Sequence, residues 1–193
     1  MHTLRRECPW DAQQTHESLV TYLVEEAAEV VEAIEAGDDT HLREELGDLL
    51  LQVVFHAEIA AEEDRFTLDD VADQVADKLI QRHPYVFGTA AVPEDLHRTW
   101  EARKRAEKGR TSALDGIPGA LDTLARATKV VSRSRLHQVA VELPEEPISA
   151  EATGQEILAV VARAQAAGID ADQATRAAVR ALETRVRQTE MIS

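Results

Sequence analysis

Apolar positions recur every three or four residues along most of the chain, a spacing that predicts amphipathic helices. The alternation typical of strands is nearly absent, so we expect an all-α fold. Glycine- and proline-containing stretches separate the helical segments. The helices are expected at about residues 15–36, 40–64, 67–82, 96–107 and 120–137, followed by two between residues 151 and 190 that are broken at Gly168-Ile169-Asp170.

Residues at the segment ends support these limits. Gly37 can adopt the left-handed conformation that ends a helix, and Asp39 or Thr40 can cap the next one. Thr67 and Asp70 have the spacing of a capping box, in which each side chain bonds the other residue's main-chain N–H. The sequence therefore predicts a helical hairpin followed by a third, separately capped helix.

The first of these helices carries acids on its apolar side. On a helical wheel Glu26 lies in the middle of the apolar stripe and Glu29 at its border, about 60° away. Glu32 and Glu35 face the opposite side, where a solvated acid is expected. The apolar residues within about 60° of Glu26 are Leu19, Tyr22, Leu23, Val30 and Ala33.

The second helix is apolar almost all round, so most of it is expected to be buried. Asp48 aligns with Leu51, Phe55 and Ile59, and Glu45 lies about 60° from that line. Together with Glu26 and Glu29, these acids form a set of carboxylates expected to point into one helical core.

Ionised carboxylates in a core need a compensating charge. Each costs several kcal/mol when unpaired, even after relaxation. Arg43 is the only arginine or lysine between Glu25 and His56, so ion pairs cannot neutralise the set. A hard divalent cation can, and oxygen ligands suit Mg²⁺ or Mn²⁺ better than zinc. The alternative is a pair of partly exposed, acid-rich helices that bind nothing.

Composition narrows the function classes. The 193 residues carry 21 Lys+Arg against 36 Asp+Glu, a net charge of −15, which argues against general binding to nucleic acid or to an anionic membrane. Cys8 is the only cysteine, which excludes an internal disulfide and fits a cytoplasmic location. The chain has no 18-residue apolar run, and its N-terminus lacks the apolar core of a signal peptide.

Two segments of the chain are similar in sequence. The segment from Gly47 to Val54 resembles the segment from Gly154 to Val161, but Ala152 and Gln155 stand where the first copy has acids. We therefore expect a catalytic domain at 1–110 and a shortened, degenerate second repeat at 111–193 that lacks the metal-binding acids. Chance similarity between alanine-rich helices is the alternative.

Several motifs, taken together, resemble the MazG nucleoside triphosphate pyrophosphohydrolases. The resemblance covers about residues 4–137 strongly, and its motifs are specific. They are Cys8-Pro9-Trp10-Asp11, Gln14-Thr15-His16, Glu25-Glu26-Ala27-Ala28-Glu29, Glu44-Glu45-Leu46-Gly47-Asp48-Leu49-Leu50, Gln52-Val53-Val54-Phe55-His56 and Lys78-Leu79-Ile80-Gln81-Arg82-His83-Pro84.

This resemblance implies an α-helical, Mg²⁺-dependent enzyme that hydrolyses nucleoside triphosphates, including deoxy- and non-standard ones, to the monophosphate and pyrophosphate. Such an activity would be a house-cleaning one. The metal ligands carried over are Glu26, Glu29, Glu45 and Asp48. Glu25 and Glu44 are carried over as residues that support the ligands or act as the general base.

The resemblance also supplies cations for the phosphates. Lys78 and Arg82 share one helix face and match the family's basic pair, although a solvated face explains the same spacing. Trp100 and Lys104 resemble a segment that closes over the nucleotide, where Trp100 either stacks on the base or packs against protein.

Other readings remain open at this point. A di-iron bundle would need Glu-x-x-His motifs, which these two acidic helices lack. The competing functions are a catalytically silent helical scaffold and a related pyrophosphatase specific for dUTP or phosphoribosyl-ATP. A two-helix site cannot cover its own apolar faces, so we expect a homodimer that completes a four-helix core.

Overall fold

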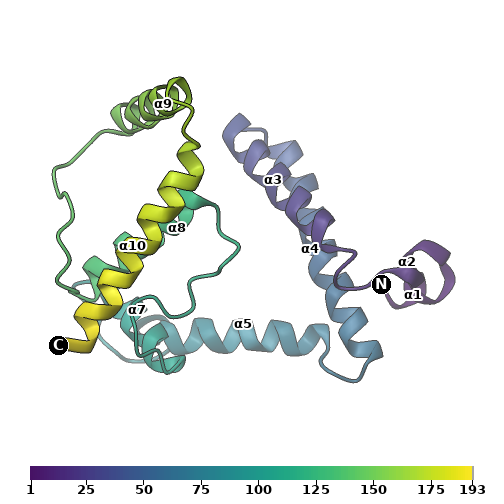
Figure 1. Ribbon diagram of the computed structural model, residues 1–193. Coiled ribbons are helices and arrows are strands. Elements are labelled where there is room, and N and C mark those ends of the chain that lie inside the picture. Colours follow the sequence, from purple (N-terminus) through teal and green to yellow (C-terminus); the bar gives the residue numbers. More distant parts are fainter. Residues whose placement is uncertain (193) are drawn as a thin grey trace. The chain divides into compact units, whose positions relative to one another are not determined.

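A computed structural model describes residues 1–192 of the chain, except for the side chain of His97 (Figure 1). The chain divides into two compact units, Met1–Ala91 and a second that begins at Val92. The described residues contain helices and no strand, which confirms the all-α class. The second unit begins at Val92, before the predicted boundary at residue 110. That it is a degenerate second repeat stays a prediction.

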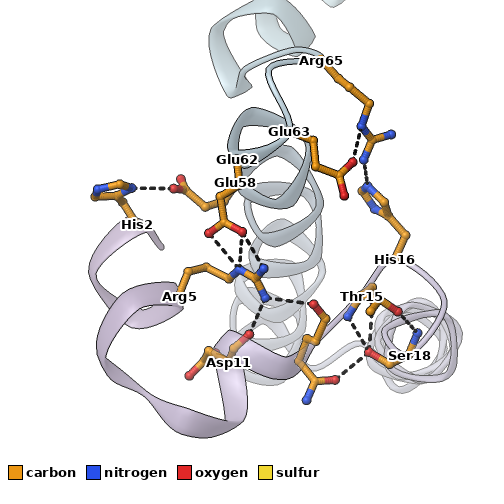
Figure 2. Close-up of polar contacts among 11 residues, drawn as sticks. His2, Arg5, Asp11, Thr15, His16, Ser18, Glu58, Glu62, Glu63 and Arg65 are labelled. Atoms are coloured by element: carbon orange, nitrogen blue, oxygen red, sulfur yellow. Dashed lines mark hydrogen bonds and ion pairs between the residues drawn. The ribbon is translucent and has the colours of Figure 1, made fainter.

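The first unit opens with two short helices, α1 (His2–Glu7) and α2 (Pro9–Gln13). Arg5 ties both to the end of α4, as Figure 2 shows. Its Nη1 donates to the main-chain oxygens of Asp11 and Gln14 at 2.5 and 2.9 Å, and its Nη2 pairs with Glu62 Oε2 at 2.6 Å. One guanidinium therefore satisfies the carbonyls of a tight connection and anchors it to a long helix.

The next segment forms a helical hairpin, α3 (Val20–Ala36) and α4 (Asp39–Glu62). Gly37 ends α3 with a φ of 68°, as predicted. The cap of α4 is Asp38, not Asp39 or Thr40, because its Oδ1 accepts from the N–H groups of Thr40 and His41. Helix α3 begins later than the predicted residue 15, because residues 16–19 form a turn.

Only one side of the hairpin is buried. Leu19, Ala33, Phe55 and Ile59 are at most 4% exposed. The prediction that most of α4 is buried is wrong for the chain by itself, since Leu46, Leu50, Leu51 and Val53 are 40–59% exposed. Within this unit α4 packs mainly on α3, and one neighbour can cover only one face of a helix.

Helix α5 (Leu68–Arg82) begins with the predicted capping box, in which Thr67 and Asp70 bond each other's main-chain N–H groups. The short helix α6 (Pro84–Phe87) follows it, in the stretch between the predicted helices at 67–82 and 96–107. Before α3, the His16 ring stacks on that of His56, with their Nδ1 atoms 2.7 Å apart, which fastens the incoming turn to α4.

The second unit contains α7 (Leu96–Glu107), α8 (Thr123–Leu136), α9 (Ala150–Ala166) and α10 (Ala171–Ile192). Its core lies between α8 and α10, where Val130, Val179, Leu182 and Val186 are buried together. Helix α9 contacts α10 and leaves Leu158 69% exposed. Among the described residues, no helix combines the length and apolar character needed to cross a membrane.

Candidate metal centre

The hairpin brings together carboxylates from both of its helices. Glu26 and Glu29 on α3 and Glu45 on α4 each offer an oxygen within 4.8 Å of the other two. Glu45 is buried at 7% exposure, Glu26 is half-buried and Glu29 is exposed. The cluster therefore lies at the edge of the helix–helix contact, with one side open to solvent.

Local sequence explains this geometry. Glu26 and Glu29 are three residues apart, so they point from neighbouring positions on one side of α3. Glu26 is on the same wheel face as Leu19 and Ala33, both of which are buried. The Gly37-Asp38 turn folds α4 back along α3, which brings Glu45 opposite these acids.

The charges in the cluster repel one another. Burial and the nearby carboxylates of Asp48 and Glu29 raise the pKa of Glu26. Gln52 opposes the shift by donating from Nε2 to Glu26 Oε1 at 3.5 Å. His41 lies one turn before Glu45, and its Nε2 is 2.8 Å from Glu45 Oε1.

This donor set fits a hard divalent cation. All three gathered ligands are carboxylates, and no lysine or arginine of the described chain forms an ion pair with them. A further oxygen, Gln52 Oε1, is buried without a hydrogen-bond partner among the described residues, beside the amide nitrogen that contacts Glu26. Mg²⁺ and Mn²⁺ bind at sites whose ligands are oxygens and whose negative charge has no lysine or arginine partner.

The predicted ligands do not all occupy equal positions. Asp48 is outside the group whose oxygens gather, although its charge raises the pKa of Glu26. Asp48 is half-buried, and Glu45 is the buried acid of α4. Of the residues aligned with Asp48 on the wheel, Phe55 and Ile59 are buried and Leu51 is 43% exposed, so this side of α4 is only partly covered.

The other predicted residues lie outside the cluster. Glu25 and Glu44 are exposed next to ligand positions on α3 and α4. Lys78 is on α5, where its Nζ donates to Gln74 Oε1 at 2.7 Å, and Arg82 follows one turn later. These residues therefore stay predicted participants.

Trp100 and Lys104 belong to the second unit, on α7. Both are half-buried, and Lys104 Nζ pairs with Glu101 Oε1 at 3.6 Å. Their proposed contact with a nucleotide stays a prediction.

Two polar neighbours of the cluster were missed from the sequence. His41 precedes Glu45 by four residues, and Gln52 follows Asp48 by four. For His41 that i,i+4 spacing was the available signal, because side chains four residues apart on a helix are neighbours, whereas Gln52 contacts Glu26 on the other helix. Attention to the charged residues alone left both out.

Comparisons with known proteins identify the family. The sequence profile of the MazG nucleotide pyrophosphohydrolase domain matches residues 14–87, which include every acid of the cluster. An uncharacterised 26.1 kDa protein of Streptomyces cacaoi is 45% identical over 195 residues, covering 98% of this chain and 79% of that protein. The chain belongs to the MazG family. This confirms the resemblance, and the matched domain is a hydrolase domain.

One relative named as a pyrophosphohydrolase is longer than this chain. The nucleoside triphosphate pyrophosphohydrolase of Mycobacterium tuberculosis is 42% identical over 166 residues, covering 82% of this chain and 51% of that protein. The chain thus spans about half the length of this relative. A crystal structure of a MazG-related protein from Thermotoga maritima matches with a TM-score of 0.47 and 30% identity, over 54% of this chain and 92% of that one.

Proposed function

We propose that this MazG chain hydrolyses nucleoside triphosphates to the monophosphate and pyrophosphate with Mg²⁺, for which Mn²⁺ can substitute. The observation that carries the proposal is the gathering of Glu26, Glu29 and Glu45 oxygens within 4.8 Å, inside a region that matches the MazG domain. Asp48 completes the ligand set, since its charge acts directly on Glu26.

Each residue has a distinct part in the proposed reaction. Glu26, Glu29, Glu45 and Asp48 would hold the metal, which would neutralise phosphate charge and lower the pKa of the attacking water. An exposed carboxylate, Glu25 or Glu44, accepts the proton of the attacking water. The α–β phosphoanhydride bond breaks as the new P–O bond forms, and pyrophosphate leaves.

Cations from other helices complete the substrate site in this proposal. Lys78 and Arg82, one turn apart on α5, bind the leaving phosphates. Trp100 and Lys104 on α7 close over the nucleotide. The partner is thus a small nucleotide, and the net charge of −15 argues against nucleic acid.

We also propose that the first unit forms a homodimer. The outer faces of α3 and α4 each expose a stripe of apolar side chains at helical spacing. These residues, each at least 40% exposed, are Val20, Val24, Val31 and Ile34 on α3 and Leu46, Leu50 and Val53 on α4. A second copy would cover both stripes and complete a four-helix core, at a gain of about 25 cal/mol per Å² of apolar surface.

Turnover tests the catalytic proposal. Release of monophosphate and pyrophosphate is measured for a panel of standard and damaged nucleoside triphosphates, dUTP and phosphoribosyl-ATP, with Mg²⁺ or Mn²⁺. Glu29→Ala and Asp48→Ala should abolish release, whereas Glu32→Ala, on the opposite face of α3, should retain it. Equal turnover in all variants would refute the assigned site, and no turnover of any compound would favour the silent scaffold.

Light scattering during size exclusion tests the dimer. We expect a mass of two chains for the wild type and of one chain for Leu50→Glu. Leu124→Glu, a control at a similarly exposed position on α8, should remain dimeric. A monomeric wild type would contradict the proposal.

A further inference from the structure

The second unit contains a cavity of about 450 Å³ between α7, the turn that follows it and the end of α8. Its volume is within the range of about 300–1,000 Å³ typical of small-molecule sites. Basic side chains and small apolar ones share the wall. The residues that matter here are Arg98, Arg105, Arg110, His137, Ala102 and Ala106.

This pocket uses a different face of α7 from the one proposed to close over the substrate. Arg98, Ala102 and Arg105 fall within about 60° of one another on a helical wheel, whereas Trp100 and Lys104 lie about 120° or more from Arg98. The second unit therefore presents a basic wall that the proposed catalytic role leaves unused.

One arginine of the pocket is held by main-chain carbonyls, and another lies against a glycine. Arg105 donates from Nε to the carbonyl of Arg110 at 3.1 Å and from Nη2 to that of Thr111 at 2.9 Å, which fixes the turn after α7. The Arg110 guanidinium lies against Gly116, where an added Cβ would come within 2.8 Å of Nη2. Gly116, with a φ of 71°, thus leaves room for the side chain of Arg110.

Positive charge is crowded around this pocket. His137 Nδ1 lies 3.4 Å from Arg105 Nη1. Burial first, and then the charges of Arg105 and Arg133, lower the pKa of His137. Burial and the charge of Arg110 likewise lower the pKa of Arg133. A bound anion would relieve this repulsion.

Acids near the pocket have other partners. No aspartate or glutamate is among the described residues that line it. Asp115 accepts from the main-chain N–H groups of Thr111 and Ser112, both at 2.9 Å. Glu101 pairs with Lys104, and Glu190 accepts from Ser112 and Ala113; both acids oppose the lowering of the His137 pKa but do not outweigh it. The chain as a whole has a net charge of −15, so the positive charge of the residues that line this pocket is opposite in sign to the net charge.

We propose that this pocket binds a pyrophosphate group, either as the free anion or as the phosphate end of a nucleotide. Arg98 and Arg110 contact its oxygens through their planar guanidinium groups, and His137 donates from Nε2. Arg105 is a positioning residue, because its donors hold the turn that carries Arg110. The walls formed by Ala102 and Ala106 leave room for the rest of a nucleotide.

Calorimetric titration of the full chain with inorganic pyrophosphate or ADP, in EDTA, tests this inference. Without metal the acidic cluster repels anions, and the arginine variants of the basic pocket separate binding there from binding at Lys78 and Arg82. We expect one site per chain. Arg98→Gln and Arg110→Gln should each weaken binding about tenfold, which is the loss of one charge-assisted contact. Stronger binding of ADP would identify a nucleotide ligand, and equal binding the free anion.

Two further variants keep the test decisive. Ala102→Glu adds a negative charge at an exposed position of the wall and should abolish binding even where an arginine variant misfolds. Arg163→Gln, the same charge change on α9, should bind as the wild type does. Absence of binding by the wild type, or equal weakening by Arg163→Gln, would overturn the site. Glu45→Gln should bind pyrophosphate normally, which separates this inference from the proposed catalysis.

Discussion

Replacing Glu45 with glutamine should stabilise the metal-free protein. Two unit charges 4.8 Å apart, the upper limit in this cluster, repel by about 0.9 kcal/mol in water and about 3.5 kcal/mol at an effective dielectric of about 20. Glu45 takes part in two such pairs, with Glu26 and with Glu29. Since Glu29 is exposed, the lower figure applies, and the variant is relieved of about 2 kcal/mol of repulsion.

The substitution also removes a favourable contact. Glu45 pairs with His41, which is 39% exposed, so the loss is at most about 1 kcal/mol. The net gain is about 1 kcal/mol, or about 4–8 °C in the Tm of a unit of this size. In Mg²⁺ the order reverses, because the wild type gains about 2.7 kcal/mol when the ion is at a hundredfold excess over its Kd.

Thermal unfolding followed by circular dichroism, in EDTA and in Mg²⁺, measures both effects. Glu45→Gln should melt above the wild type in EDTA and show little further rise in Mg²⁺. Glu32→Gln makes the same charge change on the exposed face of α3 and should keep the wild-type response to the ion. If Glu45→Gln melts lower in EDTA and responds to Mg²⁺ as the wild type does, the repulsive cluster is not a metal site.

Three further predictions follow from contacts in the first unit. The pKa of Glu26 is raised in the folded state, so the stability of the protein in EDTA should rise as pH decreases through that pKa towards the ordinary glutamate value. Over the same pH range the affinity for Mg²⁺ should fall. Thermal melts and Mg²⁺ titrations at several pH values should show neither trend in Glu26→Gln. Arg5→Met, which loses Glu62 and two carbonyls, should lower the free energy of unfolding in urea by about 2–3 kcal/mol, and Arg5→Lys should recover less than half of that. Thr67→Ala should cost about 0.5–2 kcal/mol in the same assay, whereas an equal cost for Thr40→Ala would argue against the capping geometry seen here.

The limits of the helices were predictable because each depends on a few neighbouring residues. Gly37 ends α3 since a left-handed conformation suits glycine, and Thr67 starts α5 by bonding a main-chain group three residues away. The predicted helix at 96–107 coincides with α7. Where the local signal was shared by adjacent acids, as at Asp38 and Asp39, the choice of cap was wrong.

The acidic cluster was predictable in outline only. The wheel correctly paired the acids of α3 with those of α4, because sequence spacing determines which side of a helix a residue occupies. It did not indicate that Glu45 is buried more deeply than Asp48, because α4 is apolar almost all round and its pattern does not specify which face meets α3.

The sequence by itself determined the helical class, most helix ends and which helices carry the clustered acids, since these depend on spacing and on short-range hydrogen bonds. Only the tertiary structure decided that Glu45 is the buried acid, that Gln52 contacts Glu26 across the hairpin, and that the outer faces of α3 and α4 are exposed. It also joined Arg98 to His137 in one basic pocket. These outcomes depend on how each helix is rotated against its neighbour, which is set by packing between residues far apart in the chain.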